Sequence, residues 1–382
     1  MPKKPAPSTA DFLNPVQMIA SAAVLANALI LFFPLAAGLV ERSRSELYYV
    51  LVQEDGALEW MTFWAFILAA VGFVYIARGQ RRAGGGTPWL TIGVALFCFV
   101  VAMEEISWGQ RVLGYRPPEY FLKENFQQEL NLHNVMSTSF RKLALKGTIL
   151  GYGVILPLLA LAQPIRKLVS RFGPQVSPLG LIPSFAITFW IYDSYPWRFS
   201  GEIVEMMLGL GFLFAACTSA LDERFLSQTI LGKVSLAMAA TLSLGLVAFA
   251  YSHFSARNDP ARIESATTEL EALARDFKPR GRPISKCGVH KRVFSWAEKY
   301  RQLDSLAGGR FAGLVDQGLP DARAQYFIDP WNSPIWIRHK CSRSKGREMA
   351  FLYSFGPNRR RNSSDWEIGG DDIGIVLVER RR

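Results

Sequence analysis

Long apolar blocks dominate the first two thirds of the chain. A membrane-spanning helix needs about 20 mostly apolar residues. Seven blocks reach or approach that length: Met18–Val40, Ala57–Ala77, Trp89–Met103, Thr148–Gln163, Leu179–Tyr192, Ile203–Ala220 and Val234–Tyr251. Tryptophans stand near several block ends, where interfacial aromatic residues are expected. The pattern predicts a multi-pass helical membrane domain over residues 1–253, with about seven spans.

After residue 253 the apolar runs become short and turn residues separate them. Apolar residues recur at helical spacing between Pro260 and Phe277, and Pro279 and Gly281 follow as stop signals. A second helix is expected around Lys291–Leu306. Three strands are expected at Ile335–His339, Met349–Ser354 and Ile373–Glu379. The pattern therefore predicts a small α+β domain over residues 254–382.

Composition and charge agree with this division. Half of the 382 residues are hydrophobic, 20% are charged and the mean hydropathy is +0.13, which is too apolar for a disordered protein. The blockwise distribution also excludes one soluble globular fold. Residues 254–382 carry 24 Lys and Arg against 16 Asp and Glu, and so hold most of the net charge of +11.

Loop charges and cysteines bear on orientation. Lys and Arg number ten in the short loops on the side of the N-terminus and three on the opposite side, although the long loop 104–146 adds six to the latter. The positive-inside rule then predicts a cytoplasmic N-terminus. Seven spans place the tail outside, in the periplasm of a bacterial inner membrane. There Cys287 and Cys341 either pair or remain free thiols.

Ionisable residues gather at the span ends that this topology places outside. The candidate catalytic residues are Glu59, Glu104, Glu105, Arg111, His133 and Glu205, and the same loop offers Ser107, Gln110, Glu129 and Asn134. In a functional interpretation Arg111 binds an anionic head group, His133 acts as base or ligand, and a carboxylate pair holds a cation or shuttles a proton. In the alternative, Arg111 forms an ion pair with a neighbouring glutamate and the others are solvated.

Other chemistry has little support. No two of the four histidines stand at i, i+4 spacing, and neither a glycine-rich phosphate loop nor a G-x-S-x-G elbow is present. The stretch EEISWGQR at 104–111, followed by NLHN at 131–134, resembles a signature of uncharacterised bacterial multi-pass membrane proteins. That resemblance implies no activity.

Three motifs in the tail follow one another in a recognisable order. DPWNSPIWIRH begins at Asp329, FLYSFGPN at Phe351 and GGDDIGIV at Gly369. The series resembles the periplasmic domain of the major pseudopilin of type II secretion systems. The resemblance implies a compact α+β domain after a helix. A pseudopilin has a single N-terminal span, so no filament role is expected for this chain.

The resemblance also implies a calcium loop. Its ligands would be Asn358, Asp365, Asp371 and Asp372. Calcium prefers several carboxylate and carbonyl oxygens on a flexible loop. However, Asn358 stands where Asp is usual, and Arg359–Arg361 follow directly. The alternative is a turn-rich loop whose aspartates accept backbone N–H groups or pair with the arginines.

Three function classes stay open. The first is a membrane enzyme acting on lipid or lipid-linked envelope substrates. The second is an envelope assembly or secretion-associated scaffold whose tail binds a partner. The third is a transporter, against which the few charges in the cytoplasmic half count. Expected partners are the lipid bilayer, and anionic lipid, a glycan or an envelope protein for the basic tail. No nucleic-acid partner is expected.

Overall fold

The computed structural model divides the chain into two compact units. It describes residues 15–42, 48, 51–52, 56–83, 87–113, 115, 117–125, 129–173, 176–197, 199–219, 230–255, 260–277, 287–293, 327–331, 333–342, 344, 346–359 and 361–381. The helical unit comprises residues 1–106 and 137–249, and the tail unit comprises residues 107–136 and 250–382. Each unit is described by itself, and the domain boundary at residue 253 stays a prediction.

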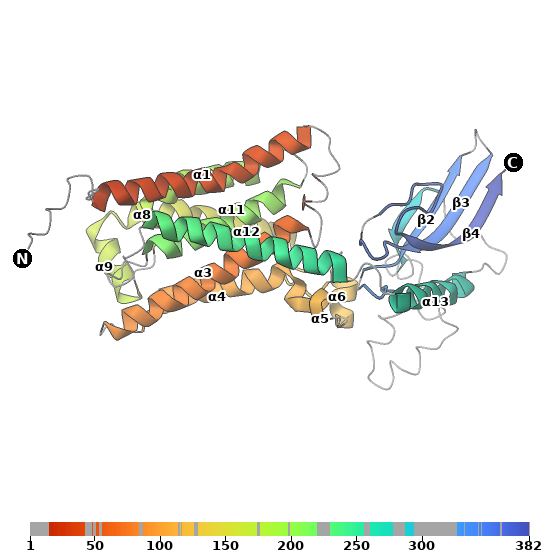
Figure 1. Cartoon of the computed structure of the whole chain (residues 1–382), viewed down its shortest axis with the longest axis horizontal. Coiled ribbons are helices and arrows are strands. Elements are labelled where there is room, and N and C mark those ends of the chain that lie inside the picture. Colours follow the sequence, from red (N-terminus) through yellow and green to blue (C-terminus); the bar gives the residue numbers. More distant parts are fainter. Residues whose placement is uncertain are drawn as a thin grey trace, which may run out of the picture. The chain divides into compact units, whose positions relative to one another are not determined.

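The helical unit is built from helices alone within its described residues (Figure 1). They are α1 (Pro15–Arg42), α3 (Ala57–Arg82), α4 (Trp89–Glu105), α7 (Thr138–Lys146), the π-helical η2 (Gly147–Ile155), α8 (Leu156–Leu159), α9 (Gln163–Arg171), η3 (Leu179–Leu181), α10 (Ile182–Ser194), α11 (Ser200–Ser219) and α12 (Ile230–Ser255). Segments α7, η2 and α8 follow one another without a break.

Within the described residues, five segments are long and apolar enough to cross a membrane. They are Ser21–Arg42, Ala57–Arg82, Thr138–Leu159, Ser200–Thr218 and Gly232–Ser252. The chain is therefore a multi-pass membrane protein, as the hydropathy pattern predicts. Two predicted spans fall on shorter elements, namely α4 with 17 residues and the η3–α10 pair.

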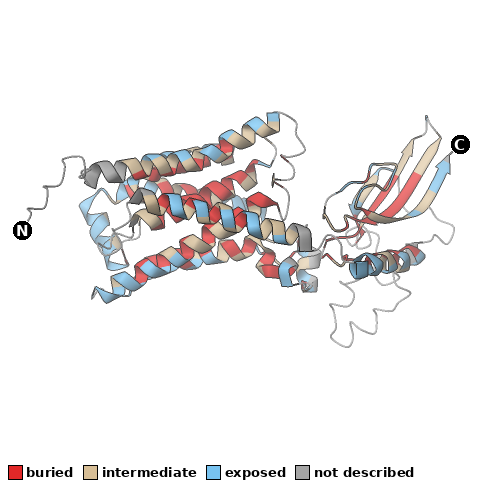
Figure 2. Ribbon diagram, viewed as in Figure 1, coloured by how far each residue is buried: buried red, intermediate tan, exposed pale blue. Residues whose placement is uncertain are grey.

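One helix forms the centre of the helical unit. In α11, 72% of the span residues are buried, against 17% in α1 and 22% in α12 (Figure 2). Small residues allow the neighbouring helix α3 to come close. A Cβ at Gly209 would lie 3.1 Å from Ala65, and one at Gly72 would lie 3.0 Å from Ala216. Such contacts are typical of helix packing in lipid, where no hydrophobic force drives helices together.

The tail unit combines a helical loop with a sheet and one long helix. The loop holds η1 (Ser107–Gly109), α5 (Gln110–Leu113) and α6 (Glu119–Glu124), and α13 spans Pro260–Phe277. The strands β1 (Val289–Arg292), β2 (Trp336–Ser342), β3 (Arg347–Ser354) and β4 (Ile373–Arg381) form an antiparallel sheet in the order β1-β2-β3-β4. Leu270 and Leu273 of α13 share a core with Ile337 and Leu352 of the sheet.

This arrangement confirms the small α+β tail and corrects one of its elements. The helix predicted around Lys291–Leu306 is wrong at its start, because Lys291 and Arg292 belong to β1. They pair with Ile337 and Trp336 of β2. Residues 294–306 lie outside the described part of the chain. The structure pairs Cys287 with Cys341, which decides between the two states left open above.

Candidate functional site

Five glutamates from three helices gather in the helical unit. Glu105 of α4 lies within electrostatic range of its neighbour Glu104, of Glu59 on α3, and of Glu202 and Glu205 on α11. Glu104 is 8% exposed and the other four are half-buried. We call these five residues the carboxylate cluster. Four of them are candidates that the sequence singled out, but their catalytic role stays a prediction.

Helix ends make this cluster electrostatically uneven. Glu59 and Glu202 lie in the first turns of α3 and α11, where the partial positive charge of the helix N-terminus favours a carboxylate. Glu104 and Glu105 end α4, where the partial negative charge opposes one. At Glu105, repulsion from the other four carboxylates adds to this unfavourable effect of the helix end. The arrangement therefore favours uptake of a positive charge near the end of α4.

The carboxylate cluster is not among the compact metal-ligand sets found within the described residues. Among the described residues, the set of three or more His, Cys, Asp and Glu side chains whose ligand atoms lie within 4.8 Å of one another is Cys287, His339 and Cys341. The carboxylate cluster does not form such a compact ligand set. A carboxylate that exchanges a proton needs no such cage.

Cations and a phenol border the cluster on its α10 side. Tyr192 lies within electrostatic range of Glu205 and also of Arg141 and Lys146 on α7. The Lys146 ammonium forms a 2.5 Å ion pair with Asp193 and lies 5.7 Å from the centre of the Phe189 ring. Tyr192, Arg141 and Lys146 were not among the sequence candidates, whereas Asp193 and Glu202 belong to the charged residues at the predicted outer span ends but not to the six catalytic candidates. The position of Glu202 three residues before Glu205, on the same helix face, was an available signal.

An apolar groove of about 800 Å³ lies between α4 and η2. Phe97, Tyr152 and Phe212 line it, and the Tyr152 and Phe212 rings stack 4.6 Å apart. Gly93, Gly147 and Gly151 also line it, and a Cβ at any of the three would meet nothing within 4 Å. Phe97 precedes Glu104 by two helical turns, which places this end of the groove about 10 Å from the cluster along α4.

Two of the predicted site residues lie in the other unit. Arg111 is part of α5, and its side chain lies outside the described part of the structure. His133 is half-buried in the loop that ends at residue 136. The predicted six-residue site is therefore divided between two separately described units.

The loop of the tail unit contains a buried polar network. The Ser107 hydroxyl donates to Glu129 Oε2 over 2.7 Å, and Asn131 Nδ2 donates to the same oxygen over 3.2 Å. Asn125 Nδ2 donates to the Glu129 carbonyl and to Asn131 Oδ1, both at 2.7 Å. These four side chains are at most 5% exposed. The sequence pointed to Ser107 and Glu129 but not to the two asparagines.

The backbone beside this network is strained. Ser107, Trp108 and Gly109 have φ values of 47°, 56° and 81°. Left-handed non-glycine residues cost about 1–3 kcal/mol each, and surrounding contacts must hold them. The Tyr115 hydroxyl provides one such contact, donating to the Trp108 carbonyl over 3.0 Å. The EEISWGQR and NLHN segments are thus parts of one folded loop.

The three tail motifs also meet in space. Asp329 of the first motif accepts a 2.5 Å hydrogen bond from the Ser354 hydroxyl of the second. Gly356 of the second motif has φ +65° and packs so closely on the Asp371 carbonyl of the third that a Cβ would overlap it. We call this meeting point the motif junction.

Protein donors already occupy the carboxylates of two of the four calcium-loop candidates, Asp365 and Asp372. Asp365 forms ion pairs with Arg338 at 2.6 Å, Arg361 at 3.1 Å and Lys340 at 3.4 Å. The Asp372 carboxylate accepts the N–H groups of Asn362 and Ser363, and Asn358 donates to Asn362. Asp371 contributes its carbonyl to the motif junction. Cations therefore already neutralise Asp365, which opposes calcium binding at that residue, and the calcium loop stays a prediction.

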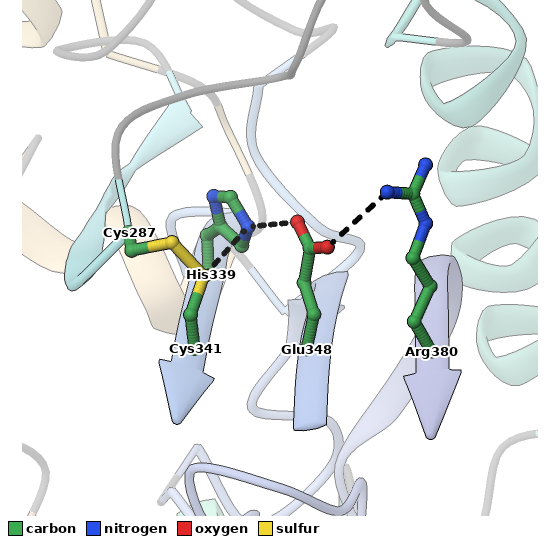
Figure 3. Close-up of a disulfide and its surroundings, with 5 residues drawn as sticks. All are labelled: Cys287, His339, Cys341, Glu348 and Arg380. Carbon is green, nitrogen blue, oxygen red and sulfur yellow. Dashed lines mark hydrogen bonds and ion pairs between the residues drawn. A yellow bond between two sulfur atoms is a disulfide. The ribbon is translucent and has the colours of Figure 1, made fainter. Parts of the chain in front are cut away.

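The disulfide lies beside a buried histidine (Figure 3). Cys341 Sγ is 3.6 Å from His339 Nε2, and the same nitrogen is 3.0 Å from Glu348 Oε1. The other Glu348 oxygen is 3.7 Å from Arg380 Nη1. His339 is 2% exposed, whereas Cys287 lies at the surface.

The chain matches no protein-family model, no curated protein and no solved structure.

Proposed function

We propose that this protein is a bacterial inner-membrane enzyme that acts on a lipid or lipid-linked envelope substrate, with the carboxylate cluster as its acid–base centre. The observation that carries the proposal is the grouping of Glu105 with four other glutamates from α3, α4 and α11. Carboxylates near the hydrocarbon layer are expensive and mark functional sites more often than structural ones. The helix end and the repulsion together favour a proton on one of them, and a protonated carboxyl can act as a general acid.

The apolar groove supports a lipid as the substrate class. Its near end is about 10 Å from the cluster along α4, and one leaflet of hydrocarbon is about 15 Å thick. An acyl chain whose head group lies at the cluster can therefore reach the groove. Arg141, which lies within electrostatic range of Tyr192, provides a cation that suits an anionic head group, whereas Lys146 is already paired with Asp193.

The disulfide supports the proposed orientation, with a cytoplasmic N-terminus and a periplasmic tail. Disulfides persist in oxidising compartments such as the bacterial periplasm. The seven spans predicted from the sequence are odd in number, and an odd number of spans corresponds to termini on opposite sides of the membrane.

The first test compares lipid extracts by mass spectrometry. A bacterial host would express wild-type protein, Glu105→Gln or, as a matched control, Glu124→Gln, whose side chain is exposed on α6. We expect at least one lipid species to change with wild type and with the control. Glu105→Gln should reduce that change at least about 100-fold, since acid–base groups contribute 10²–10⁴ in rate. Identical lipid extracts from all strains would contradict the proposed enzymatic activity.

A second test uses the open glycines of the groove. Gly151→Leu would extend a side chain into the groove from a position where a Cβ meets nothing within 4 Å, and Gly79→Leu does so from an equally open position on α3, away from the groove. We expect Gly151→Leu to suppress the lipid change at least about tenfold, through loss of more than 1.4 kcal/mol of chain burial, and Gly79→Leu to leave it intact. Equal activity of the two variants would mean that the substrate does not bind in the groove.

The motif junction favours a second candidate, an envelope scaffold with a pseudopilin-like tail. Its support is that the three motifs of the resemblance are in contact through Asp329, Ser354 and Gly356. If no lipid changes, chemical crosslinking of the full chain in cells would test this candidate. Capture of one reproducible envelope protein, lost on truncation after residue 253, would favour it.

A further inference from the structure

We propose that the Cys287–Cys341 disulfide is an exchange site for the dithiol of a thiol–disulfide oxidoreductase, with His339 promoting the exchange and Glu348 positioning His339. The proposal rests on the contacts drawn in Figure 3 and is independent of the membrane chemistry proposed above. A disulfide that only braces a fold needs neither a histidine at one sulfur nor a carboxylate behind it.

The two sulfurs differ in access. Cys287 is exposed and Cys341 is half-buried beside His339. An incoming thiolate therefore reaches the Cys287 sulfur first, and Cys341 becomes the leaving group. Exchange is faster when the leaving thiolate is stabilised. Because Cys341 is the leaving group, the negative charge forms on the sulfur that lies beside His339.

The exchange balances in two steps. A thiolate of the partner dithiol attacks Cys287 Sγ and forms a mixed disulfide, while the Cys287–Cys341 bond breaks and its electron pair passes to Cys341 Sγ. His339 Nε2 lies 3.6 Å from Cys341 Sγ and 3.0 Å from Glu348 Oε1, and its one N–H turns from the carboxylate to the new thiolate once Cys341 is released. The second thiolate of the partner then attacks its own mixed-disulfide sulfur and releases Cys287 as a thiolate, which takes a proton from water. The partner leaves oxidised and this chain is reduced.

Glu348 completes the arrangement. Its Oε1 lies 3.0 Å from His339 Nε2, and this contact fixes the orientation of the imidazole ring beside Cys341 Sγ. Arg380 Nη1 lies 3.7 Å from the other Glu348 oxygen, Oε2, and so contacts the same carboxylate from β4. Because His339 is 2% exposed, little water competes with these contacts.

The test measures reduction of the full-length protein in detergent by dithiothreitol, a small dithiol. Samples would be quenched by alkylation and analysed by mass spectrometry at pH 7. A two-unit rise in the pKa of the leaving thiol slows exchange about tenfold. We therefore expect His339→Gln to react about tenfold more slowly than wild type. The control His290→Gln changes the β1 histidine that contacts Tyr353 at 2.7 Å, and it should react at the wild-type rate.

A second readout separates this role from a merely structural one. In the reduced protein, the pH midpoint for alkylation of Cys341 should rise in both His339→Gln and Glu348→Gln, while that of Cys287 should not move. Glu348 is partly exposed, and so its variant is expected to fold even if His339→Gln does not. Equal reduction rates in wild type and Glu348→Gln, with unchanged midpoints, would overturn the proposal. So would a wild-type disulfide that resists dithiothreitol in the folded protein.

Discussion

Replacing Asp329 with alanine is expected to lower the unfolding free energy of the tail sheet by at least about 3 kcal/mol. The Asp329 carboxylate is 1% exposed and accepts hydrogen bonds from Trp331 N at 3.0 Å, Ser333 N at 2.7 Å and the Ser354 hydroxyl at 2.5 Å. Alanine would leave these buried donors without an acceptor. Hydrogen exchange of peptides from β2, β3 and β4, measured on the full chain in detergent, would report the loss.

The same residue sets a pH dependence with a definite sign. Burial raises the pKa of Asp329 from its usual 3.8 to about 6, although the hydrogen bonds from Ser354, Ser333 and Trp331 oppose the rise. The folded state therefore binds more protons than the unfolded state between pH 4 and 6. The contribution of Asp329 to stability is greatest below pH 4 and falls by about 3 kcal/mol as the pH rises through 6.

Asp329→Asn provides the matched control. Its amide oxygen can accept the two backbone N–H groups, and its NH₂ group can donate to the Ser354 oxygen. We expect it to keep most of the stability at pH 7 and to abolish the decline between pH 4 and 6. An alanine variant as protected as wild type, or an asparagine variant with the full decline, would contradict this account of the motif junction.

Gly153→Val is expected to lower the thermal midpoint of the helical unit by about 10 °C, through overpacking of about 3 kcal/mol. A Cβ at Gly153 would overlap the Phe185 ring, which is 2% exposed. The centre of the Phe185 ring lies 6.2 Å from the centre of the Tyr152 ring and 6.4 Å from that of the Phe212 ring. The strain would therefore spread into the contact between η2, α10 and α11.

Gly151→Val is the control for this prediction. Gly151 lies two residues away on the same π-helical segment, where a Cβ meets nothing within 4 Å. We expect its thermal midpoint, followed by size-exclusion chromatography after heating in detergent, to stay within about 2 °C of wild type. Similar midpoints for the two variants would mean that the packing of Gly153 on Phe185 contributes little.

Hydropathy predicted the membrane architecture well because a bilayer imposes length and apolarity directly. It placed the fourth span at Thr148–Gln163, but the helix runs from Thr138 to Leu159. Its first turns carry Arg141, Lys142 and Lys146, and these charges lower the mean hydropathy of the segment below that of a typical span. The helix nevertheless begins there, because the Ser137 hydroxyl caps it by accepting the Phe140 N–H. Capping and charge at an interface are local chemistry that a hydropathy average does not register.

The candidate sites were predictable only in part. Charge at span ends pointed to Glu59, Glu104, Glu105 and Glu205, because carboxylates in such positions are rare. It did not point to Tyr192, which reaches Glu205 from α10 through helix packing. The β1 strand was missed because four residues carry too little periodicity, and its pairing with β2 is set by contacts more than 40 residues apart in sequence.

The strand order of the tail sheet limits how this domain can assemble. Its edges are β1, which has four residues and is tied to β2 by the disulfide, and β4, whose end carries Glu379, Arg380 and Arg381. Short, tethered or charged edges discourage the addition of a further strand. A protein that binds this sheet is therefore expected to use side chains on its faces or turns rather than backbone pairing. Polymerisation through sheet edges is disfavoured for the same reason.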